Sequence, residues 1–220
     1  MYTVNEKMQF DEKYKTKLLF VRHGESLGNA EHRFLGHTDK DLSERGYLQA
    51  AKTTEFLSEE KIDVVYSSSL IRAVNTVRPH AELRGLPVIL SDNFREIYAG
   101  DWEDLLVSEI QEKWHDEFLE SWRKNFFTCV VPHGESVPHL ANRIKNEALR
   151  VAAENEGKTI LVGCHAAAIR SLFGLLSGKE PAEINGVIDY PANASVSVVY
   201  FDGKNLIPGE YSHSDHLEGI

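Results

Sequence analysis

The sequence predicts an α/β fold: a mixed, mostly parallel central sheet with helices on both faces and a helical cap insert. Two observations support this prediction. Short apolar runs alternate with segments of helical periodicity along most of the 220 residues, and a stretch rich in Trp and Phe interrupts the alternation near the middle. The length suits one ordinary domain, and 42% hydrophobic residues, spread along the chain, are enough for one core.

The first half of the chain contains three predicted strands separated by two predicted helices. The apolar runs that predict strands are LLFV at 18–21, IDVVY at 62–66 and a run at 87–90. Ser43 is suited to cap a helix that extends to about Glu60, and a second helix over 70–83 is closed by Gly85. Residues 1–16 are polar and are expected to form an N-terminal extension before a single domain over 17–220.

The second half of the chain is predicted to hold a helical insert and then a return to the sheet. The insert covers about 103–135 and contains two helices between Glu103 and Lys124. Ser136 is placed to cap a long helix that reaches about Glu154. The remaining predicted strands are TILVGC at 159–164, which leads into a helix that starts with AAAIR, and SVSVVYF at 195–201.

The composition argues against several kinds of partner. The formal charge is −10 and no run of Lys and Arg stands out, so we expect no binding to nucleic acid. No apolar run approaches the roughly 18 residues of a membrane-spanning helix, and the N-terminus lacks the apolar part of a signal peptide. Cys129 and Cys164 form no CxxC pair, which suits a reducing compartment. We therefore expect a cytoplasmic protein without a membrane partner.

Groups that suit a phosphoryl ligand follow three of the predicted strands. Arg22 and His23 come directly after the strand at 18–21, Arg72 lies in the first turn of the helix after 62–66, and His165 follows 159–164. Parallel strands of such a sheet bring their carboxyl ends to one edge, where ligands bind. A helix N-terminus and a guanidinium both attract phosphate. Each residue taken alone is as well explained by a structural role, but their coincidence predicts a phosphate site.

A proton donor for a leaving group is also expected near this site. Glu96 lies in the apolar segment FREIYAGDWE, and apolar surroundings favour a protonated carboxyl group. We therefore assign Glu96 as the acid. The structural alternative is an ion pair between Glu96 and Arg95.

Three other motifs have competing interpretations. Gly24 to Gly28 matches the GxSxG elbow of serine hydrolases, but it follows the first predicted strand rather than a central one, and a polar loop follows it. A second His-Gly-Glu-Ser at 133–136 is interpreted as a helix-entry turn, although Glu135 is expected to border the site. The C-terminal YSHSDHLEGI has no recognisable metal-ligand pattern and is predicted to be a solvated tail.

The motifs LFVRHGES, SSSLIRA, FREIYAGDWE, PHGES and VGCHAAAIR, in this order, resemble the histidine phosphatase superfamily, which includes cofactor-dependent phosphoglycerate mutase. The resemblance implies a phosphoglycerate mutase-like fold and a phosphohistidine intermediate on His23. It further implies that Arg22, Arg72 and His165 bind the phosphoryl oxygens, and that Glu96 acts first as an acid and then as a base towards water. It implies neither a metal nor a cofactor.

Departures from the mutase pattern favour a phosphatase. Mutases carry Glu-Arg-His-Tyr-Gly around the acid, where this chain has Glu-Ile-Tyr-Ala-Gly at 96–100, and Leu35 stands where mutases offer a hydroxyl group. Only Arg123-Lys124 represents the paired arginines of the mutase insert. We predict a phosphomonoesterase acting on a small phosphorylated metabolite, with a cofactor-dependent phosphoglycerate mutase as the alternative. A catalytically silent member that only binds phosphorylated ligands or a protein partner is a third interpretation.

Substrate contacts are expected outside the phosphoryl site. The residues expected to make them are Asn29, Leu35, Gly36, Glu135 and Ala166. A further hypothesis gives the pocket an apolar side, although at least half of the aromatic residues named for it are expected to be core. The residues considered for that side are Leu35, Ile97, Trp102, Trp114, Trp122, Phe126 and Phe127.

Overall fold

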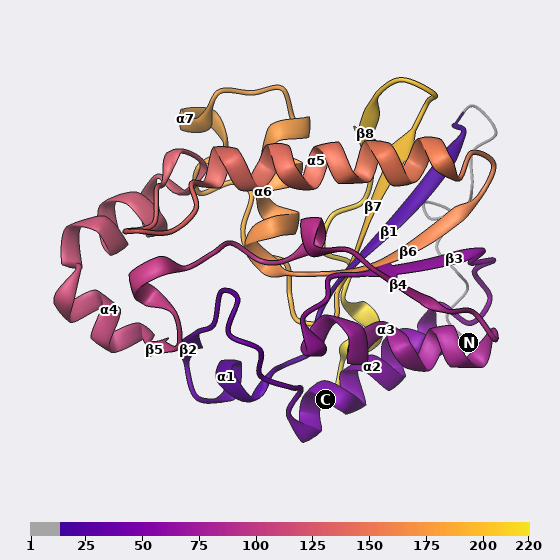
Figure 1. Ribbon diagram of the computed structural model, residues 1–220, viewed down its shortest axis with the longest axis horizontal. Coiled ribbons are helices and arrows are strands. Elements are labelled where there is room, and N and C mark those ends of the chain that lie inside the picture. The colour runs from indigo at the N-terminus through magenta and orange to yellow at the C-terminus, as the bar shows by residue number, and fades with distance from the viewer. Residues whose placement is uncertain (1–13) are drawn as a thin grey trace.

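The centre of the protein is a six-stranded sheet of order β4-β3-β6-β1-β7-β8, seen in a computed structural model that describes residues 14–220 (Figure 1). The strands β4, β3, β6 and β1 are parallel, whereas β7 runs antiparallel to both of its neighbours. The strands are β1 (Thr16–Arg22), β3 (Val64–Ser67), β4 (Val88–Leu90), β6 (Thr159–Cys164), β7 (Val196–Phe201) and β8 (Leu206–Pro208). The predicted mixed, mostly parallel sheet is confirmed.

Helices cover both faces of this sheet, because successive residues of its inner strands point to opposite sides. In β1, Leu18 and Phe20 join the apolar cluster that includes α5 and α6, whereas Leu19 and Val21 join the cluster that includes α3. Figure 1 shows α5 and α6 on one side of the sheet and α2 and α3 on the other. These helices are α2 (Glu44–Phe56), α3 (Ile71–Leu83), α5 (Val137–Glu154) and α6 (Ala166–Leu176).

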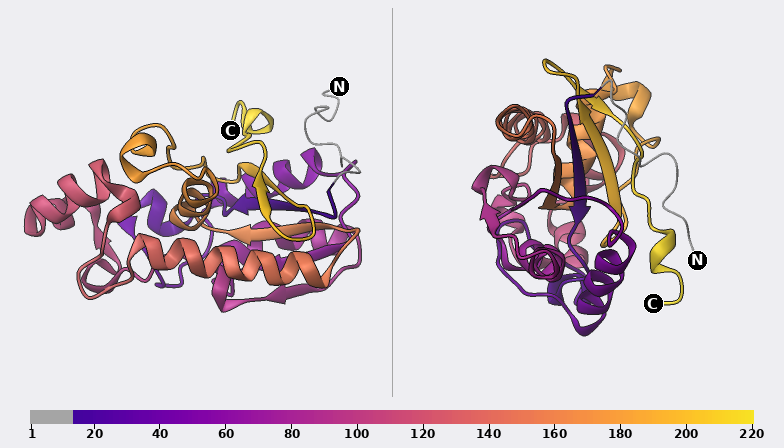
Figure 2. Two further views of the ribbon diagram at one scale, coloured as in Figure 1. Left: turned by 90° about the horizontal axis from the view of Figure 1, so that it is seen from above. Right: turned by 90° about the vertical axis from the view of Figure 1, so that its right-hand side faces the viewer.

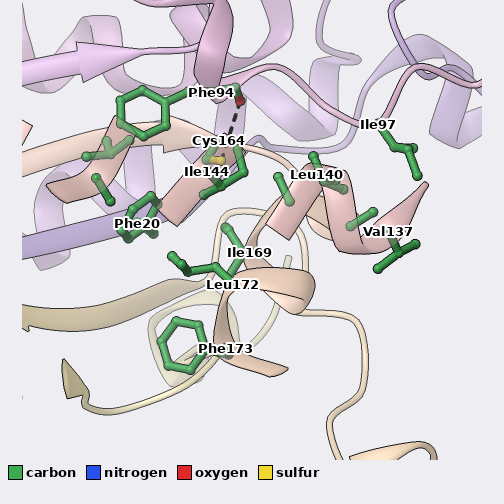
Figure 3. Close-up of a cluster of buried hydrophobic side chains, with 14 of the residues drawn as sticks. Phe20, Phe94, Ile97, Val137, Leu140, Ile144, Cys164, Ile169, Leu172 and Phe173 are labelled. Carbon is green, nitrogen blue, oxygen red and sulfur yellow. Dashed lines mark hydrogen bonds between the residues drawn. The ribbon is translucent and has the colours of Figure 1, made fainter. Parts of the chain in front are cut away.

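The larger of the two cores lies between the sheet and helices α5 and α6 (Figure 3). Phe20 of β1 meets the ring of Phe94 edge to face, with centroids 6.0 Å apart. Ile144 of α5 and Ile169 of α6 are fully buried in the same cluster. Burial of such side chains stabilises the fold by about 1.5–3 kcal/mol each. This core fixes the position of α6, and therefore of the residues at its N-terminus.

The helical insert lies beyond one end of the sheet, at the left of Figure 1 and of the left panel of Figure 2. Its helices pack on Trp102, whose ring centroid is 5.6 Å from that of Phe118 and 5.9 Å from that of Trp122. A small second sheet pairs the start of the insert with the chain that follows β1. The elements are β2 (Arg33–Phe34), β5 (Leu105–Leu106), α4 (Val107–Lys113), the π-helical η4 (Glu117–Lys124) and η5 (Phe126–Thr128).

Most long elements lie where the sequence predicts them. Ser43 and Ser136 cap α2 and α5, as predicted, but α2 ends at Phe56 rather than near Glu60. Several short elements were not predicted: β2, β5, β8, α1 (Leu27–Ala30), α7 (Pro181–Ile184) and the single turns η2 (Asp92–Phe94), η3 (Gly100–Trp102) and η6 (Asp215–Leu217). No helix within the described residues is both long and apolar enough to cross a membrane.

Both ends of the described chain contact the sheet or its helices. The predicted N-terminal extension lies outside the described residues except for 14–16, where Tyr14 stacks on Tyr200 and β1 already begins at Thr16. The prediction of a solvated C-terminal tail is wrong. The His213 amide N–H donates to the Val196 carbonyl at 2.9 Å, and the His216 ring stacks on Phe56 of α2 with centroids 4.5 Å apart.

Candidate active site

A cavity of about 240 Å³ opens where β1 and β6 end and α3 begins. Strand ends and the helix starts that follow them contribute Arg22, His23, Arg72, Ala166 and Ala167 to its wall. Glu96 and Ile97 line it as well. The chain after β1, the insert and the segment before β7 supply the rest: Asn29, Arg33, Phe34, Leu35, Gly36, Val107, Phe118, Trp122, Arg123 and Tyr190. The sheet edge predicted to bind phosphate is therefore the base of a real cavity.

His23 is held as a neutral imidazole with one nitrogen free to react. Its ring is buried, and Nδ1 lies 2.7 Å from the carbonyl oxygen of Gly24. A carbonyl can only accept, so Nδ1 carries the proton and Nε2 keeps its lone pair. Burial, and then the charges of Arg72 and Arg22, hold the pKa of His23 well below its ordinary value. The imidazole is therefore unprotonated at neutral pH, as a nucleophile must be.

The loop after His23 is pressed against the first turn of α2. The Gly24 amide donates to the Thr76 hydroxyl at 3.0 Å. A Cβ on Gly24 would lie 2.5 Å from the Gly46 carbonyl oxygen, and a Cβ on Gly46 would lie 2.0 Å from the Glu25 carbonyl oxygen. Only glycine permits two backbones to approach this closely. The contact therefore restricts the position of the loop that carries His23.

Two guanidinium groups flank the cavity, that of Arg72 buried and that of Arg22 half-buried. Arg72 donates from Nη2 to the Gly36 carbonyl at 2.7 Å and from Nη1 to the Thr38 carbonyl at 2.8 Å. Arg22 donates from Nη1 to the Pro191 carbonyl at 2.6 Å. Burial lowers the pKa of each arginine to about 10, so both stay charged at neutral pH. Their positive charge is available to an anion.

The loop that holds Arg72 is itself held by Glu103, a contact that the sequence did not reveal. The Glu103 carboxylate accepts from the amides of His37 at 2.8 Å and Thr38 at 2.9 Å. Gly36 has φ +52°, and a Cβ there would lie 2.2 Å from Glu103 Oε1. The motif that contains Glu96 also contains Glu103, but nothing in the sequence shows which loop it contacts.

His165 lies beside His23 at the start of α6, with ring centroids 5.2 Å apart. Its Nε2 is 2.8 Å from the Ser68 hydroxyl, which also accepts a bond of 3.3 Å from the Leu70 amide. The arrangement that satisfies all of these groups has the Ser68 hydroxyl donating to Nε2, which leaves the proton on Nδ1. Burial, and then Arg72, hold the pKa of His165 well below its ordinary value. His165 is fully buried and is not among the residues that line the cavity, but its Nδ1 has no partner within the described residues and can donate to an oxygen bound beside His23.

Glu96 lies in the cavity wall, but its surroundings are not those expected from the sequence. Its carboxylate accepts three amide hydrogen bonds, from Ile97 at 2.8 Å, Ala167 at 3.0 Å and Ala168 at 3.1 Å. The purely apolar setting is therefore wrong, because the start of α6 supplies two polar partners. The alternative ion pair with Arg95 is also absent from the described residues, since Arg95 pairs with Asp92 at 2.9 Å.

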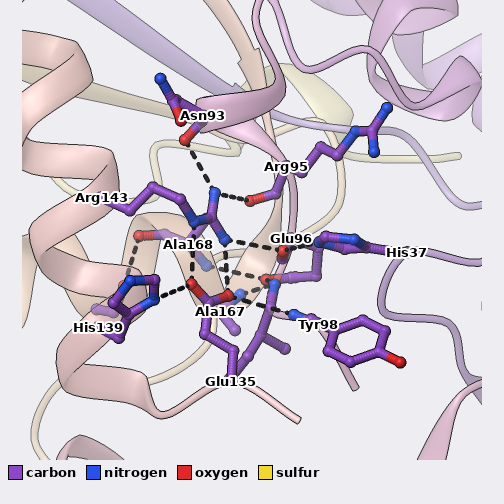
Figure 4. Close-up of polar contacts among 12 residues, drawn as sticks. His37, Asn93, Arg95, Glu96, Tyr98, Glu135, His139, Arg143, Ala167 and Ala168 are labelled. Carbon is purple, nitrogen blue, oxygen red and sulfur yellow. Dashed lines mark hydrogen bonds and ion pairs between the residues drawn. The ribbon is translucent and has the colours of Figure 1, made fainter. Parts of the chain in front are cut away.

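Four of the five expected substrate contacts lie in the cavity wall: Asn29, Leu35, Gly36 and Ala166. Glu135 does not, and this prediction is corrected. Its side chain is 8% exposed and pairs with Arg143, behind the segment that carries Glu96 (Figure 4). Of the aromatic residues considered for an apolar side, Trp122 lines the cavity, whereas Trp102 and Phe126 are fully buried core. Reasoning from sequence did not identify Tyr190 or Arg123 as residues of the cavity wall.

Burial and helix capping decide between the interpretations of the GxSxG match at 24–28 and of the second His-Gly-Glu-Ser at 133–136. Ser26 is fully buried, and its hydroxyl accepts from the Asn29 amide at 3.1 Å as the cap of α1. It cannot act as an exposed nucleophile, although β1 is in fact central in the sheet. The second His-Gly-Glu-Ser is the entry turn of α5, as predicted, with Ser136 as its cap. Among the described residues no group of three or more His, Cys, Asp or Glu could hold a metal ion.

A neutral, buried imidazole set between guanidinium groups at the edge of an α/β sheet defines a class of enzyme that takes phosphoryl groups onto histidine. Comparison with known proteins agrees. The profile of the histidine phosphatase superfamily (branch 1) matches residues 18–208. The chain belongs to the histidine phosphatase superfamily.

Individual relatives include both phosphatases and mutases. The chain is 34% identical to phosphoserine phosphatase 1 of Hydrogenobacter thermophilus, over 91% of this chain and 94% of the relative. It is 31% identical to 2,3-bisphosphoglycerate-dependent phosphoglycerate mutase of Bartonella tribocorum, over 76% and 84% respectively. The structure of phosphoserine phosphatase from Entamoeba histolytica with 3-phosphoglyceric acid superposes with a TM-score of 0.77 at 25% identity, covering 92% of this chain and 99% of that one.

Proposed function

We propose that residues 17–220 act as a single phosphatase domain, which hydrolyses phosphate monoesters of small metabolites through a phosphohistidine on His23. The observation that carries this proposal is the neutral His23 ring, buried in a cavity that it shares with Arg22 and Arg72. Phosphoryl transfer depends chiefly on position and charge stabilisation. These three side chains supply a nucleophile and two fixed positive charges in one place.

In the first step, His23 Nε2 forms a bond to phosphorus while the ester P–O bond breaks. Arg22, Arg72 and the Nδ1–H of His165 bind the non-bridging oxygens and stabilise their charge. The hydrogen bond from His23 Nδ1 to the Gly24 carbonyl stabilises the positive charge that develops on the imidazole. Glu96 acts as the general acid and gives a proton to the leaving oxygen.

In the second step, water takes the place of the departed alcohol. The Glu96 carboxylate accepts a proton from this water as its oxygen bonds to phosphorus, and the P–N bond to His23 breaks. Inorganic phosphate is released and His23 returns to its neutral form. Of the two carboxylate oxygens of Glu96, Oε2 accepts only one amide bond and so keeps a lone pair for the proton.

The cavity wall favours transfer to water over transfer to a second phosphorylated substrate. Leu35 and Ile97, both buried, line the cavity and offer no hydrogen bond to a phosphoglycerate. The phosphoserine phosphatase relative is also matched over more of this chain than the mutase relative. Both observations support hydrolysis rather than interconversion.

The outer wall favours a substrate that carries a carboxylate as well as a phosphate. Arg33 lines the cavity but is paired with Glu31 at 2.7 Å. Arg123 also lines it and forms no ion pair within residues 14–220. The Tyr190 hydroxyl is buried beside Arg170, and its proton can be donated to the same ligand. Phosphoserine, the substrate named for two of the relatives, has this chemistry.

The test compares phosphoserine with phosphoethanolamine, which lacks only the carboxylate, in the absence of added metal. We expect phosphate release from phosphoserine to be faster by about tenfold or more, because a charge-assisted hydrogen bond contributes about 1.5–3 kcal/mol. Arg123→Gln should remove most of this preference, and Lys124→Gln should not, because Lys124 already pairs with Glu120. Equal rates on the two compounds would contradict the carboxylate assignment.

The nucleophile is tested separately by trapping the phosphoenzyme from a radiolabelled substrate. Acid-labile label should appear on the wild-type protein and be absent from His23→Ala, whereas His115→Ala, which removes an exposed imidazole, should label normally. A coupled assay for interconversion of 3-phosphoglycerate and 2-phosphoglycerate, with bisphosphoglycerate present, runs beside it. Interconversion without phosphate release would identify a mutase, and failure to label would support a silent binding protein.

The cellular location is also a proposal. Cys129 and Cys164 are buried free thiols, and burial raises the pKa of Cys129 to about 11. Unreactive thiols of this kind suit a reducing compartment, so we propose that the enzyme acts in the cytoplasm.

A further inference from the structure

Arg143 of α5 donates hydrogen bonds to the backbone of the segment that carries Glu96 (Figure 4). Its Nη1 donates to the carbonyl of Asn93 at 2.9 Å and to that of Arg95 at 3.0 Å. Its Nη2 donates to the carbonyl of Glu96 itself at 3.1 Å. One rigid guanidinium therefore fixes three carbonyl groups within four residues.

Glu135 fixes Arg143 in turn. Its Oε1 accepts from Arg143 Nε at 3.0 Å and its Oε2 from Arg143 Nη2 at 2.8 Å, so the pair is bidentate. Oε2 also lies 3.3 Å from the Tyr98 amide, and the Glu135 amide donates to the Tyr98 carbonyl at 2.8 Å. The pair thus holds the chain on both sides of Glu96.

This pair does not touch the proposed substrate site. Glu135 and Arg143 line a separate depression with Tyr98 and His139, and neither lines the cavity that contains His23. The side chains are 8% and 16% exposed, and a bidentate ion pair with so little exposure is held in one geometry. Its hydrogen bonds reach the proposed site through the backbone of Glu96.

Glu96 is held both at its carboxylate and at its backbone carbonyl. The amides of Ala167 and Ala168 hold the carboxylate from α6, while Arg143 and His37 hold the carbonyl of the same residue from the other side. Displacement by about 1 Å of a group that must meet the leaving oxygen can cost about 100-fold in rate.

We propose that Glu135 and Arg143 are positioning residues, which fix the position of the acid, Glu96, relative to the leaving-group oxygen. This inference rests on the proposed function. It assigns to the second His-Gly-Glu-Ser segment a part in catalysis, although that segment contributes nothing to the cavity wall. The acid matters only when the leaving oxygen needs a proton, so the effect of the pair depends on the leaving group.

The test measures kcat/KM for two substrates, phosphoserine, whose alkoxide needs a proton, and 2,4-dinitrophenyl phosphate, whose phenolate leaves without one. Glu96→Gln gives the pattern for complete loss of the acid, which general acid catalysis places at about 10²–10⁴ on the first substrate. We expect Arg143→Met to lose about 10- to 100-fold on phosphoserine and less than about threefold on the dinitrophenyl ester. Arg143→Lys should fall between wild type and Arg143→Met.

Lys145→Met is the matched control, since Lys145 is on the same helix, two residues from Arg143, and its side chain forms no hydrogen bond or ion pair within residues 14–220. It should leave both substrates unchanged. Glu135→Gln keeps the shape of the pair but weakens it, and serves if Arg143→Met is poorly folded. Its effect should nearly vanish in the Arg143→Met background, because the two residues act as one unit.

Equal losses on the two substrates, in both Arg143→Met and Glu135→Gln, would overturn the inference and leave the pair a purely structural role. If Glu96→Gln itself shows no dependence on the leaving group, the assignment of the acid fails, and this inference fails with it. If Glu96→Gln shows the dependence and the Arg143 and Glu135 variants do not, only the inference is lost and the proposed function stands.

Discussion

Replacement of Gly46 by Ala tests whether the contact between α2 and the nucleophile loop sets the position of His23. The new Cβ would be built 2.0 Å from the Glu25 carbonyl oxygen. Carbon–oxygen contacts are normally about 3.3 Å or longer, so the two backbones must separate by roughly 1.3 Å. Glu25 is two residues from His23, and the Ser43 amide also donates to its carbonyl at 2.8 Å.

The magnitudes predict a larger effect on activity than on stability. Overpacking costs about 1–3 kcal/mol, and the better helix propensity of Ala returns up to about 1 kcal/mol. The net loss of about 1–2 kcal/mol corresponds to a decrease in Tm of roughly 2–8 °C in a chain of this size. A shift of the nucleophile by about 1 Å costs up to about 100-fold in kcat/KM.

The assay combines kcat/KM for phosphoserine with thermal unfolding of the same preparations. Leu48→Ala is the control, because Leu48 lies on α2 and its side chain is exposed, with 59% of its surface accessible. A Gly46→Ala variant that keeps wild-type kcat/KM would refute the reasoning. It would mean that α2 moves away as a body and leaves His23 in place.

Three further results are expected. Burial, and then Arg84, lower the pKa of His80 from 6.5 to about 4. Between these two pH values the unfolded chain binds a proton at His80 and the folded chain does not, so the free energy of unfolding decreases as pH falls. Urea titrations at several pH values should show that His80→Gln makes this dependence of the free energy of unfolding on pH shallower, by up to about 1.4 kcal/mol per pH unit. Ser68→Ala frees the His165 ring to adopt the other tautomer, and steady-state kinetics should show kcat lower by about tenfold with little change in KM. Arg72→Lys cannot reach the two carbonyls that the guanidinium bridges, and kcat/KM should fall by about 100-fold or more while Lys124→Arg changes nothing.

The places of the two histidines and of Arg22 and Arg72 in the candidate site could be predicted from sequence, because each follows an apolar run that predicts a strand. His23 and His165 come after β1 and β6, two buried strands that pair in parallel, so both residues lie at the same edge of the sheet. Placing Arg72 needed only the recognition of the strand before it. A residue that follows a buried parallel strand lies at the carboxyl end of that strand, where ligands bind.

The elements that escaped prediction are too short to carry a pattern. β8 has three residues and β2 has two, and pairing with a neighbour, not side-chain alternation, makes them strands. Glu135 was assigned to the wrong surface for a related reason. Its partner lies two turns along α5, and only the packing of that helix against 93–96 reveals what the pair holds.

The main-chain partners of the two arginines have a consequence for how the enzyme responds to its own product. Arg22 and Arg72 are held by carbonyl oxygens, and neither forms an ion pair with a carboxylate within residues 14–220. An incoming oxyanion therefore has no bound carboxylate to displace, whatever molecule carries it. Inorganic phosphate presents the same oxygens as the substrate and should compete with it directly. Turnover would then slow as phosphate accumulates, and phosphate or sulfate buffers would mask the activity.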